Sequence, residues 1–174
     1  MEVFEAIKTR RSIRSFTDED VSNEDIERIL DAARYAPSAG NIQPWIFIVV
    51  RDEKIKMRLS EAALGQFFIG EAPVVIVVCA DEERSRRGYG DRGAKLYCIQ
   101  DAAAATQNIL LATHALGLGA CWIGAFNEEE VKDILGIPEG VRPVAIVPIG
   151  HPAEKPRIIF KRPLSEIVRY ETFK

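Results

Sequence analysis

The stretch from residue 94 to residue 116, AKLYCIQDAAAATQNILLATHAL, constrains the fold more than any other part of the chain. It contains no proline or glycine and is rich in alanine and leucine. Gly117 and Gly119 follow it, as is typical where a helix ends. The stretch therefore predicts a helix of roughly 35 Å. Polar residues interrupt it too often for a bilayer span.

This predicted helix is nearly apolar in every direction around its axis, through residues 102–105, 109–112 and 115–116. A helix without a polar face is typically buried on all sides. A chain of 174 residues can hardly cover such a helix alone, so we expect a second copy to complete the cover. The pattern favours a homodimer with this helix in its interface.

Composition and charge narrow the class of protein. The chain is 47% hydrophobic and carries 23 basic and 26 acidic residues, for a net charge of -3. That balance favours neither a nucleic acid nor a membrane surface as a partner. The N-terminus lacks the apolar core of a secretory signal, so we expect a cytoplasmic protein. Cys79, Cys98 and Cys121 lie far apart in apolar runs, and we interpret them as buried structural residues rather than redox or metal-binding ones.

The remaining periodicity predicts one α+β domain over residues 1–174, without repeats or linkers. Residues 152–174 form a tail with only two small apolar clusters, at 158–160 and 167–168. The tail is too sparse in apolar residues for a core of its own, so we expect it to lie over a partner subunit. The expected elements are helices at 3–8, 22–36, 53–64 and 127–135, buried strands at 46–50, 73–80 and 142–149, a strand or strand edge at 119–124, and a charged mobile loop, a candidate lid, at 81–92.

Near the N-terminus, RRSIRSF places three arginines within five residues around Ser12. Arginine guanidinium groups match phosphate oxygens in pairs, and a serine hydroxyl adds a short hydrogen bond. The motif alone is equally compatible with a solvated basic turn. The sequence PSAGNIQPW from Pro37 to Trp45 is bracketed by prolines and carries two amide side chains. These groups suit the edge of a flat heterocycle, although turn-forming residues of this kind also make plain connections.

The phosphate- and dinucleotide-binding motifs GxxxxGK[ST] and GxGxxG directly after a strand are absent from the chain, and so are the catalytic motifs GxSxG and HExxH. We interpret His114 and His151 as structural residues and Asp101 as a satisfied helix–helix contact rather than a base. Phosphate-suited arginines and heterocycle-suited amides without acid–base residues indicate that a cofactor supplies the reactivity.

Four segments together resemble the nitroreductase family of flavin enzymes: RRSIRSF, PSAGNIQPW, IQDAAAATQNILLATHALGLGACWIGAF and KRPLSEIV. They occur in the family order over essentially the whole chain. The resemblance implies a nitroreductase-like FMN-binding fold, with a central, mostly antiparallel sheet flanked by helices. It also implies a homodimer with intertwined tails and FMN bound in two interface pockets, with NAD(P)H as the usual electron donor.

The same resemblance assigns cofactor contacts to several segments and assigns no catalytic residue, because the flavin carries the chemistry. The assigned residues are Arg10, Arg11, Ser12, Arg14, Lys161 and Arg162 around the phosphate and ribityl chain, Pro37, Ser38, Ala39 and Asn41 against the ring from the partner subunit, Gln66 at the pyrimidine edge, and Ile123 and Gly124 beside the N5 edge.

The function implied is an FMN-dependent oxidoreductase with a ping-pong cycle, from NAD(P)H to flavin and then to a nitroaromatic, quinone or similar small-molecule acceptor. Two alternatives share these binding residues. One is a flavin-binding or carrier dimer without turnover, and the other is a relative that uses the fold for dehalogenation or flavin breakdown. This chain lacks the long helical insertion that shapes the substrate pocket in better-known nitroreductases, so the resemblance implies no particular acceptor.

Overall fold

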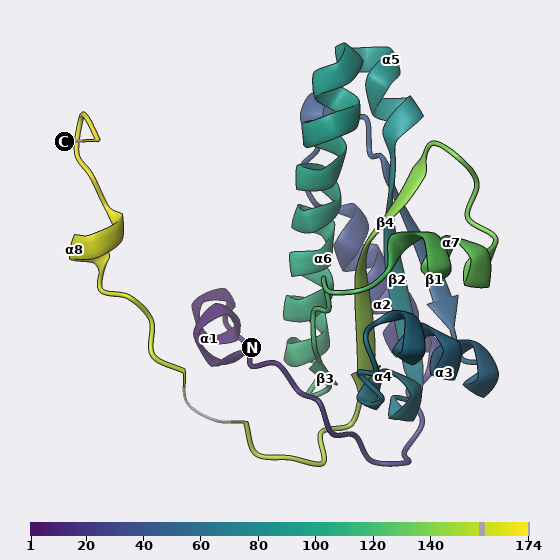
Figure 1. Cartoon of the computed structure of the whole chain (residues 1–174). Helices are drawn as coiled ribbons and strands as arrows, with labels where there is room; N and C mark the ends of the chain where they lie inside the picture. The colour runs from purple at the N-terminus through teal and green to yellow at the C-terminus, as the bar shows by residue number, and fades with distance from the viewer. Residues whose placement is uncertain (157–158, 174) are drawn as a thin grey trace.

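The computed structural model describes residues 1–156 and 159–173 and contains a four-stranded sheet between two layers of helices (Figure 1). The strands β1 (Trp45–Val50), β2 (Val74–Asp81), β4 (Val141–Gly150) and β3 (Gly119–Ala120) lie side by side in that order. All three neighbouring pairs are antiparallel. The expected α+β fold with a mostly antiparallel sheet is confirmed.

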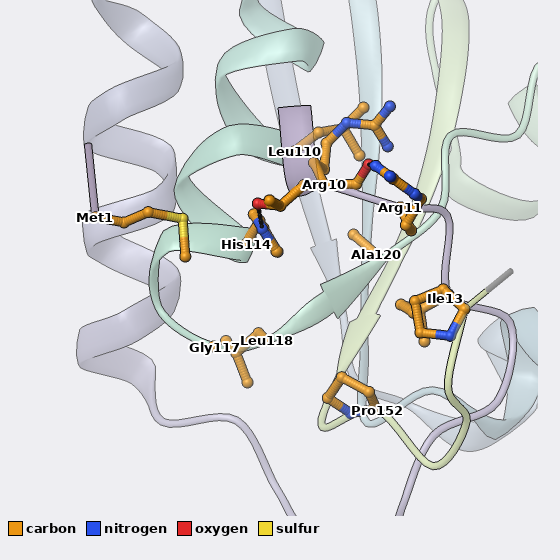
Figure 2. A pocket seen from close by; sticks show the side chains of 12 residues that line it. Met1, Arg10, Arg11, Ile13, Leu110, His114, Gly117, Leu118, Ala120 and Pro152 are labelled. Atoms are coloured by element: carbon orange, nitrogen blue, oxygen red, sulfur yellow. Dashed lines mark hydrogen bonds between the residues drawn. The ribbon is translucent and has the colours of Figure 1, made fainter. Parts of the chain in front are cut away.

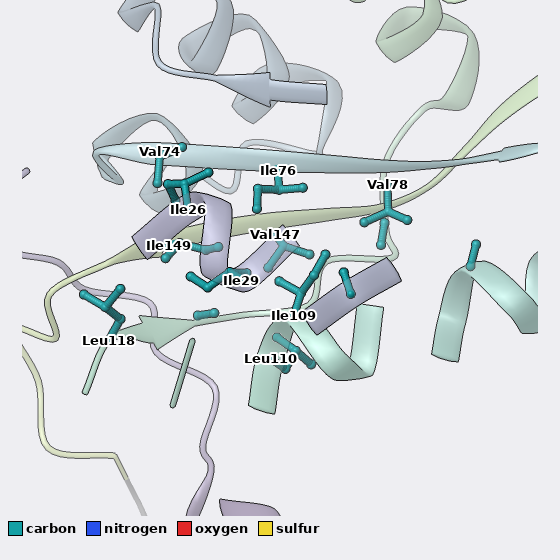
Figure 3. Close-up of a cluster of buried hydrophobic side chains, with 14 of the residues drawn as sticks. Ile26, Ile29, Val74, Ile76, Val78, Ile109, Leu110, Leu118, Val147 and Ile149 are labelled. Atoms are coloured by element: carbon teal, nitrogen blue, oxygen red, sulfur yellow. The ribbon is translucent and has the colours of Figure 1, made fainter. Parts of the chain in front are cut away.

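The two faces of the sheet bury two apolar clusters, because successive side chains of a strand point to opposite faces. Val74, Ile76 and Val78 of β2 pack with α2 (Asn23–Arg34) and α6 (Cys98–Ala115), as Figure 3 shows. Val75 and Val77 pack on the other face, against α3 (Glu53–Ala62), α4 (Phe68–Glu71) and α7 (Glu128–Leu135). A strand covered on both faces has no polar alternation, which accounts for the continuous run PVVIVVCA.

The long helix forms where it was predicted, with one addition. A π-helical turn, η2 (Gly93–Tyr97), leads directly into α6. The fully buried positions of α6 are Cys98, Asp101, Ala102, Ala105, Thr106, Ile109, Leu110 and Thr113. Within this chain the remaining positions are only half-buried or exposed, so the expected burial on all sides is not met by one chain. That incompletely covered side is available to a partner.

Side-chain caps begin four helices of the described ranges, and three of these helices were predicted from the sequence. Ser22, Asp52 and Asn127 each accept a backbone hydrogen bond from the first turn of α2, α3 and α7. Such caps satisfy amides that have no partner inside the helix. The predicted start of α2 at Ser22 and that of α7 at Asn127 are confirmed.

Two expectations about local structure were wrong. Residues 82–92 form helix α5 (Glu82–Arg92), broken only at Tyr89 and Gly90, rather than a loop. Asp81 caps this helix by accepting from the amide of Arg84. The first strand, β1, lies at the edge of the sheet, and Ile46 and Val49 are each 40% exposed, so it is not a buried strand.

The two ends of the chain lie on the same side of the body. Helix α1 (Val3–Thr9) lies beside the lower part of α6, and the tail with its short helix α8 (Leu164–Ile167) extends away from the sheet beyond α1 (Figure 1). Phe160 is 94% exposed and Phe173 is 90% exposed, so the described tail contributes nothing to the core of its own chain. The apolar cluster predicted at 158–160 lies partly outside the described residues.

None of the helices in the described ranges combines the length with the apolar content that a crossing of a membrane requires.

Candidate functional site

The arginine motif runs from the end of α1 along strand β3. Ser12 bridges Ala120 in parallel register, and the amide of Ile13 donates to the Ala120 carbonyl at 3.0 Å. Ile13 is buried, and a Cβ on Gly119 would lie 2.8 Å from its side chain, so only glycine permits this approach. With Ile13 facing inward, alternation turns Ser12 and Arg14 to the opposite side.

The three arginines differ in how their guanidinium groups are engaged. Arg11 donates to the carbonyls of Lys8 at 2.7 Å and Arg10 at 2.8 Å, which satisfies the C-terminal end of α1. The guanidinium groups of Arg10 and Arg14 have no hydrogen-bond partner in residues 1–156 and 159–173. Two of the three predicted phosphate-binding arginines are thus available to an anion, whereas Arg11 is partly committed to the fold.

Cys121, which directly follows β3, is close enough to the arginine motif to feel its charges. Burial raises the pKa of the Cys121 thiol, and the charge of Arg14, the Ser12 hydroxyl and the charge of Arg10 act in the opposite direction. A buried thiol with a raised pKa is an inert structural residue. This agrees with the interpretation of Cys121 as a buried structural residue. Because Arg14, Ser12 and Arg10 act on Cys121, the arginine motif lies near a residue only two positions before Ile123.

Ile123 and Gly124 lie at the same sheet edge but differ in what they can donate. The Ile123 amide is used, since it donates to the Ile146 carbonyl at 2.9 Å. The Gly124 amide has no partner among the described residues, and a Cβ placed on Gly124 would meet nothing within 4 Å. Of the two, only Gly124 therefore has an N–H that is not already donated to a carbonyl of the described residues.

Gln66 lies close to this edge. Its Nε2 atom donates to the carbonyls of Ala63 at 2.9 Å and Ala125 at 3.2 Å. Both amide hydrogens are thereby used, so only the side-chain oxygen remains for a ligand.

The proline-bracketed loop lies at the other end of α6. It contains a single 3₁₀ turn, η1 (Ala39–Asn41), and the Ala39 amide donates to both carboxylate oxygens of Asp101, at 3.2 and 3.3 Å. The interpretation of Asp101 as a helix–helix contact was wrong, because its partner is this loop. Ser38 accepts from the Gln43 amide at 3.0 Å, while Pro37 and Asn41 are exposed.

Within one chain, this loop and the arginines are far apart. The loop contacts α6 at Asp101, whereas the arginine motif follows Thr9, which hydrogen-bonds to His114 near the other end of the helix. Thirteen residues of helix separate Asp101 from His114, about 20 Å at 1.5 Å per residue. The loop and the arginine motif therefore lie near opposite ends of α6 and do not form one pocket within a single chain.

Lys161 and Arg162 lie on the extended tail, away from the other assigned residues. Arg162 pairs with Glu166 one turn further on, with 3.0 Å between Nε and Oε2, and both side chains are more than half exposed. Within one chain the tail segment before α8, which carries both residues, extends away from the sheet and from α6 (Figure 1).

A cavity of about 260 Å³ opens beside the arginine motif, between α1, α6 and the start of the tail (Figure 2). Arg10, Arg11 and His114 supply its polar wall, and Leu110, Leu118 and Ile13 are among its apolar lining residues. Sequence reasoning missed that His114 lies here. Its position four residues after Leu110 on the predicted helix could have indicated that the two side chains share a face.

Comparison with known proteins decides the family. The family model described as the nitroreductase family matches residues 7–69 and 61–151 of this chain. The chain belongs to the nitroreductase family. The predicted resemblance is confirmed, and the two matched segments contain the arginine motif, the proline-bracketed loop and the Ile123–Gly124 edge.

Several family members are similar over most of their length. A protein of Archaeoglobus fulgidus, provisionally named an NADH dehydrogenase/NAD(P)H nitroreductase, is 44% identical over 88% of this chain and 87% of its own. The FMN reductase [NAD(P)H] of Bacillus subtilis is 34% identical over 99% of this chain and 74% of its own.

Among solved structures of the nitroreductase fold, NfrA2 of B. megaterium has a TM-score of 0.93 at 30% identity, covering 100% of this chain and 76% of its own. The NADPH:FMN oxidoreductase of Vibrio harveyi, complexed with NAD+, has a TM-score of 0.91 at 27% identity, covering 99% of this chain and 78% of its own.

Proposed function

We propose that this nitroreductase-family chain is an FMN-dependent oxidoreductase that takes electrons from NAD(P)H and passes them to a nitroaromatic, quinone or similar small acceptor. Relatives named as NAD(P)H-dependent FMN reductase and as oxygen-insensitive NADPH nitroreductase support this proposal. Both activities use the same flavin chemistry with different acceptors.

One observation carries the proposal: segments 10–14 and 120–124, distant in sequence, lie side by side in the structure. Their juxtaposition supports a site in which Arg10 and Arg14, whose guanidinium groups have no hydrogen-bond partner among the described residues, and the Gly124 amide contact one ligand. Two cations suit a terminal phosphate, and an uncommitted backbone donor suits a ring nitrogen. The residues present therefore fit FMN.

The chain's own residues bind and orient in this mechanism. Arg10, Arg14 and Ser12 would hold the phosphate, and the Gly124 amide would donate to the ring edge. The side-chain oxygen of Gln66 would accept from the pyrimidine side. When bound, FMN supplies the hydride chemistry, so no side chain is required as an acid or base. Fixed donors and a fixed substrate position then account for the protein's contribution to the rate.

In this proposal the functional assembly is a cytoplasmic homodimer, in which residues 1–174 of each chain form a single domain. The incompletely covered side of α6 supports a partner there, as does the exposed apolar tail. Pro37, Ser38, Ala39 and Asn41 of one subunit would meet the ring held by the arginine motif of the other, because they lie about 20 Å from their own arginine motif along α6. Residues 152–174, with Lys161 and Arg162, would reach across the partner.

The absorbance spectrum of the freshly purified protein tests the cofactor. We expect flavin bands and the release of FMN rather than FAD on denaturation, since the arginines suit a terminal phosphate. Tight FAD binding with no affinity for FMN would refute the cofactor. Steady-state oxidation of NADH and NADPH with a quinone acceptor tests turnover. Bound FMN that neither nucleotide reduces would identify a carrier instead of an enzyme.

A further inference from the structure

Asp101 is a buried carboxylate, and its few contacts are not enough to make its burial favourable for the stability of the fold. Its residue is 8% exposed, and it makes no ion pair in the described part of the chain. The two contacts to the Ala39 amide are its only hydrogen bonds there. Burial raises the pKa of Asp101, and the Ala39 hydrogen bond acts in the opposite direction. A charged group kept inside with one amide partner costs free energy, so the stability of the core does not by itself explain an aspartate at this position.

The loop on the other side of this contact is under backbone strain. Gly40 has a φ of 55°, Asn41 a φ of 56° and Gln43 a φ of 54°, and the latter two are not glycine. Residues in this left-handed region cost of the order of 1–3 kcal/mol and persist only where their surroundings hold them. The loop therefore needs fixed contacts from neighbouring elements.

Three further contacts hold the loop and the helix before it. On the α5 side, Arg84 donates to the Ile42 carbonyl at 2.6 Å. The Tyr89 hydroxyl packs so close to Gly40 that a Cβ on Gly40 would be only 2.6 Å from it. On the α6 side, Asn108 donates to the Ala32 carbonyl at 3.0 Å, at the end of α2. Asp101 adds a further contact, and among the described residues it alone accepts from the Ala39 amide, which begins the η1 turn.

We propose that Asp101 is a positioning residue that fixes residues 38–43, through the Ala39 amide, in the conformation that meets the flavin ring of the partner subunit. This inference rests on the proposed function and deepens it. Asp101 touches neither cofactor nor substrate in this assignment. It acts through the loop, and its effect is felt in the pocket of the other chain.

The first test replaces Asp101 in the full-length protein. In Asp101→Leu, hydrogen exchange at the Ala39 amide should rise by about tenfold or more, with and without flavin, because the acceptor is lost. The dissociation constant for FMN should rise by about tenfold. The Tm should stay equal or rise, because the buried charge is removed. A residue with a merely structural role would instead lower the Tm.

Two controls keep this test sharp. Asp101→Asn retains one acceptor oxygen and should restore FMN affinity to within about threefold of the wild type. Thr106→Val removes another buried polar group of α6, one that bonds only to its own helix at Ala102, and should leave FMN affinity unchanged. If Asp101→Leu does not fold, Asp101→Ser, whose shorter side chain stops short of Ala39, serves in its place.

Mixed dimers show in which pocket Asp101 acts. Arg14→Glu damages the phosphate side and Asn41→Leu the ring side, so this pair tests the shared pocket itself. Asp101→Leu paired with Arg14→Glu should give one pocket of wild-type FMN affinity per heterodimer, since that pocket has an intact Arg14 and an intact loop. Asp101→Leu paired with Asn41→Leu should give no pocket of wild-type affinity, because every pocket receives a damaged loop.

Wild-type exchange at Ala39 in Asp101→Leu, or wild-type FMN affinity, would overturn the inference. So would the absence of flavin in the pair with Arg14→Glu when the Asn41→Leu pair is restored. A wild-type protein that binds no FMN would overturn the proposed function instead, while the exchange at Ala39 would still report on the contact with Asp101.

Discussion

The imidazole of His114 on α6 donates from Nε2 to the Thr9 hydroxyl at 2.8 Å. The direction follows because that hydroxyl donates its own hydrogen to the Glu5 carbonyl at 2.7 Å. This bond ties the long helix to the last turn of α1, directly before the arginine motif. Burial, and then the charges of Arg10 and Arg11, lower the pKa of His114. The folded protein therefore favours the neutral imidazole.

The lowered pKa predicts how stability depends on pH. Because the unfolded chain takes up the proton more readily, the contribution of His114 is present above its ordinary pKa of 6.5 and is lost as the pH falls through the lowered value. His114→Gln keeps a donor to Thr9 but does not titrate. Urea unfolding at pH 7.5 and 5.5 should show that the apo-protein loses more unfolding free energy than the variant does as the pH falls. An identical loss in both proteins would contradict the assignment. Flavin reduction in the variant should stay within about tenfold.

Arg14 should contribute directly to FMN affinity. Its guanidinium has no partner among the described residues, so Arg14→Ala removes a contact to the phosphate without leaving a buried group unpaired. A charge-assisted hydrogen bond of about 1.5–3 kcal/mol corresponds to a dissociation constant roughly 10 to 100 times higher. Fluorescence titration of the apo-protein with FMN measures it. Arg58→Ala, an exposed arginine on α3, is the control, and equal losses in both variants would refute a specific contact.

The tail should have two roles that mutations can separate. Its exposed apolar residues should stabilise the dimer, and Lys161 and Arg162 should contribute to FMN binding. A chain that ends at Pro156 keeps the bond between the Ala153 amide and the Ser15 carbonyl at 2.9 Å but loses the exposed apolar residues beyond it. We expect it to dissociate at micromolar concentration in sedimentation velocity and to lose flavin. The double variant Lys161→Gln, Arg162→Gln should lose FMN affinity and remain dimeric. A truncated chain that stays dimeric and yellow would show that the tail serves neither purpose.

Complementation should reveal whether two chains build each pocket. Homodimers of Arg14→Glu or of Asn41→Leu have two damaged pockets. In a doubly tagged heterodimer of these chains, one pocket collects both defects and the other none, so bound flavin should be about half that of the wild type. Flavin per purified heterodimer is the measurement. A value equal to that of the mutant homodimers would place the whole pocket within one chain.

Local patterns in the sequence determined most of the elements. Residues 94–116 predicted α6 because no residue within them breaks a helix, and Ser22 and Asn127 marked helix starts because their side chains can accept from the first turn. The run at 73–80 predicted a strand covered on both faces. Helix α5 was missed because Gly88 and Gly90 have poor helix propensity, although Asp81, as a potential cap, was a local signal for it.

Only the tertiary structure decided which distant groups meet. Nothing in the sequence around Asp101 indicates that its partner is the Ala39 amide, 62 positions earlier. Likewise, RRSIR alone does not reveal that the Arg11 guanidinium is engaged by α1 while those of Arg10 and Arg14 have no hydrogen-bond partner in the described part of the chain. Local propensity depends on neighbours three or four residues away, whereas these contacts depend on how α1 packs against α6 and how α2 and α6 pack against the sheet. The sequence therefore identified the residues of the candidate site, and the packing of the helices determined which of them can act together.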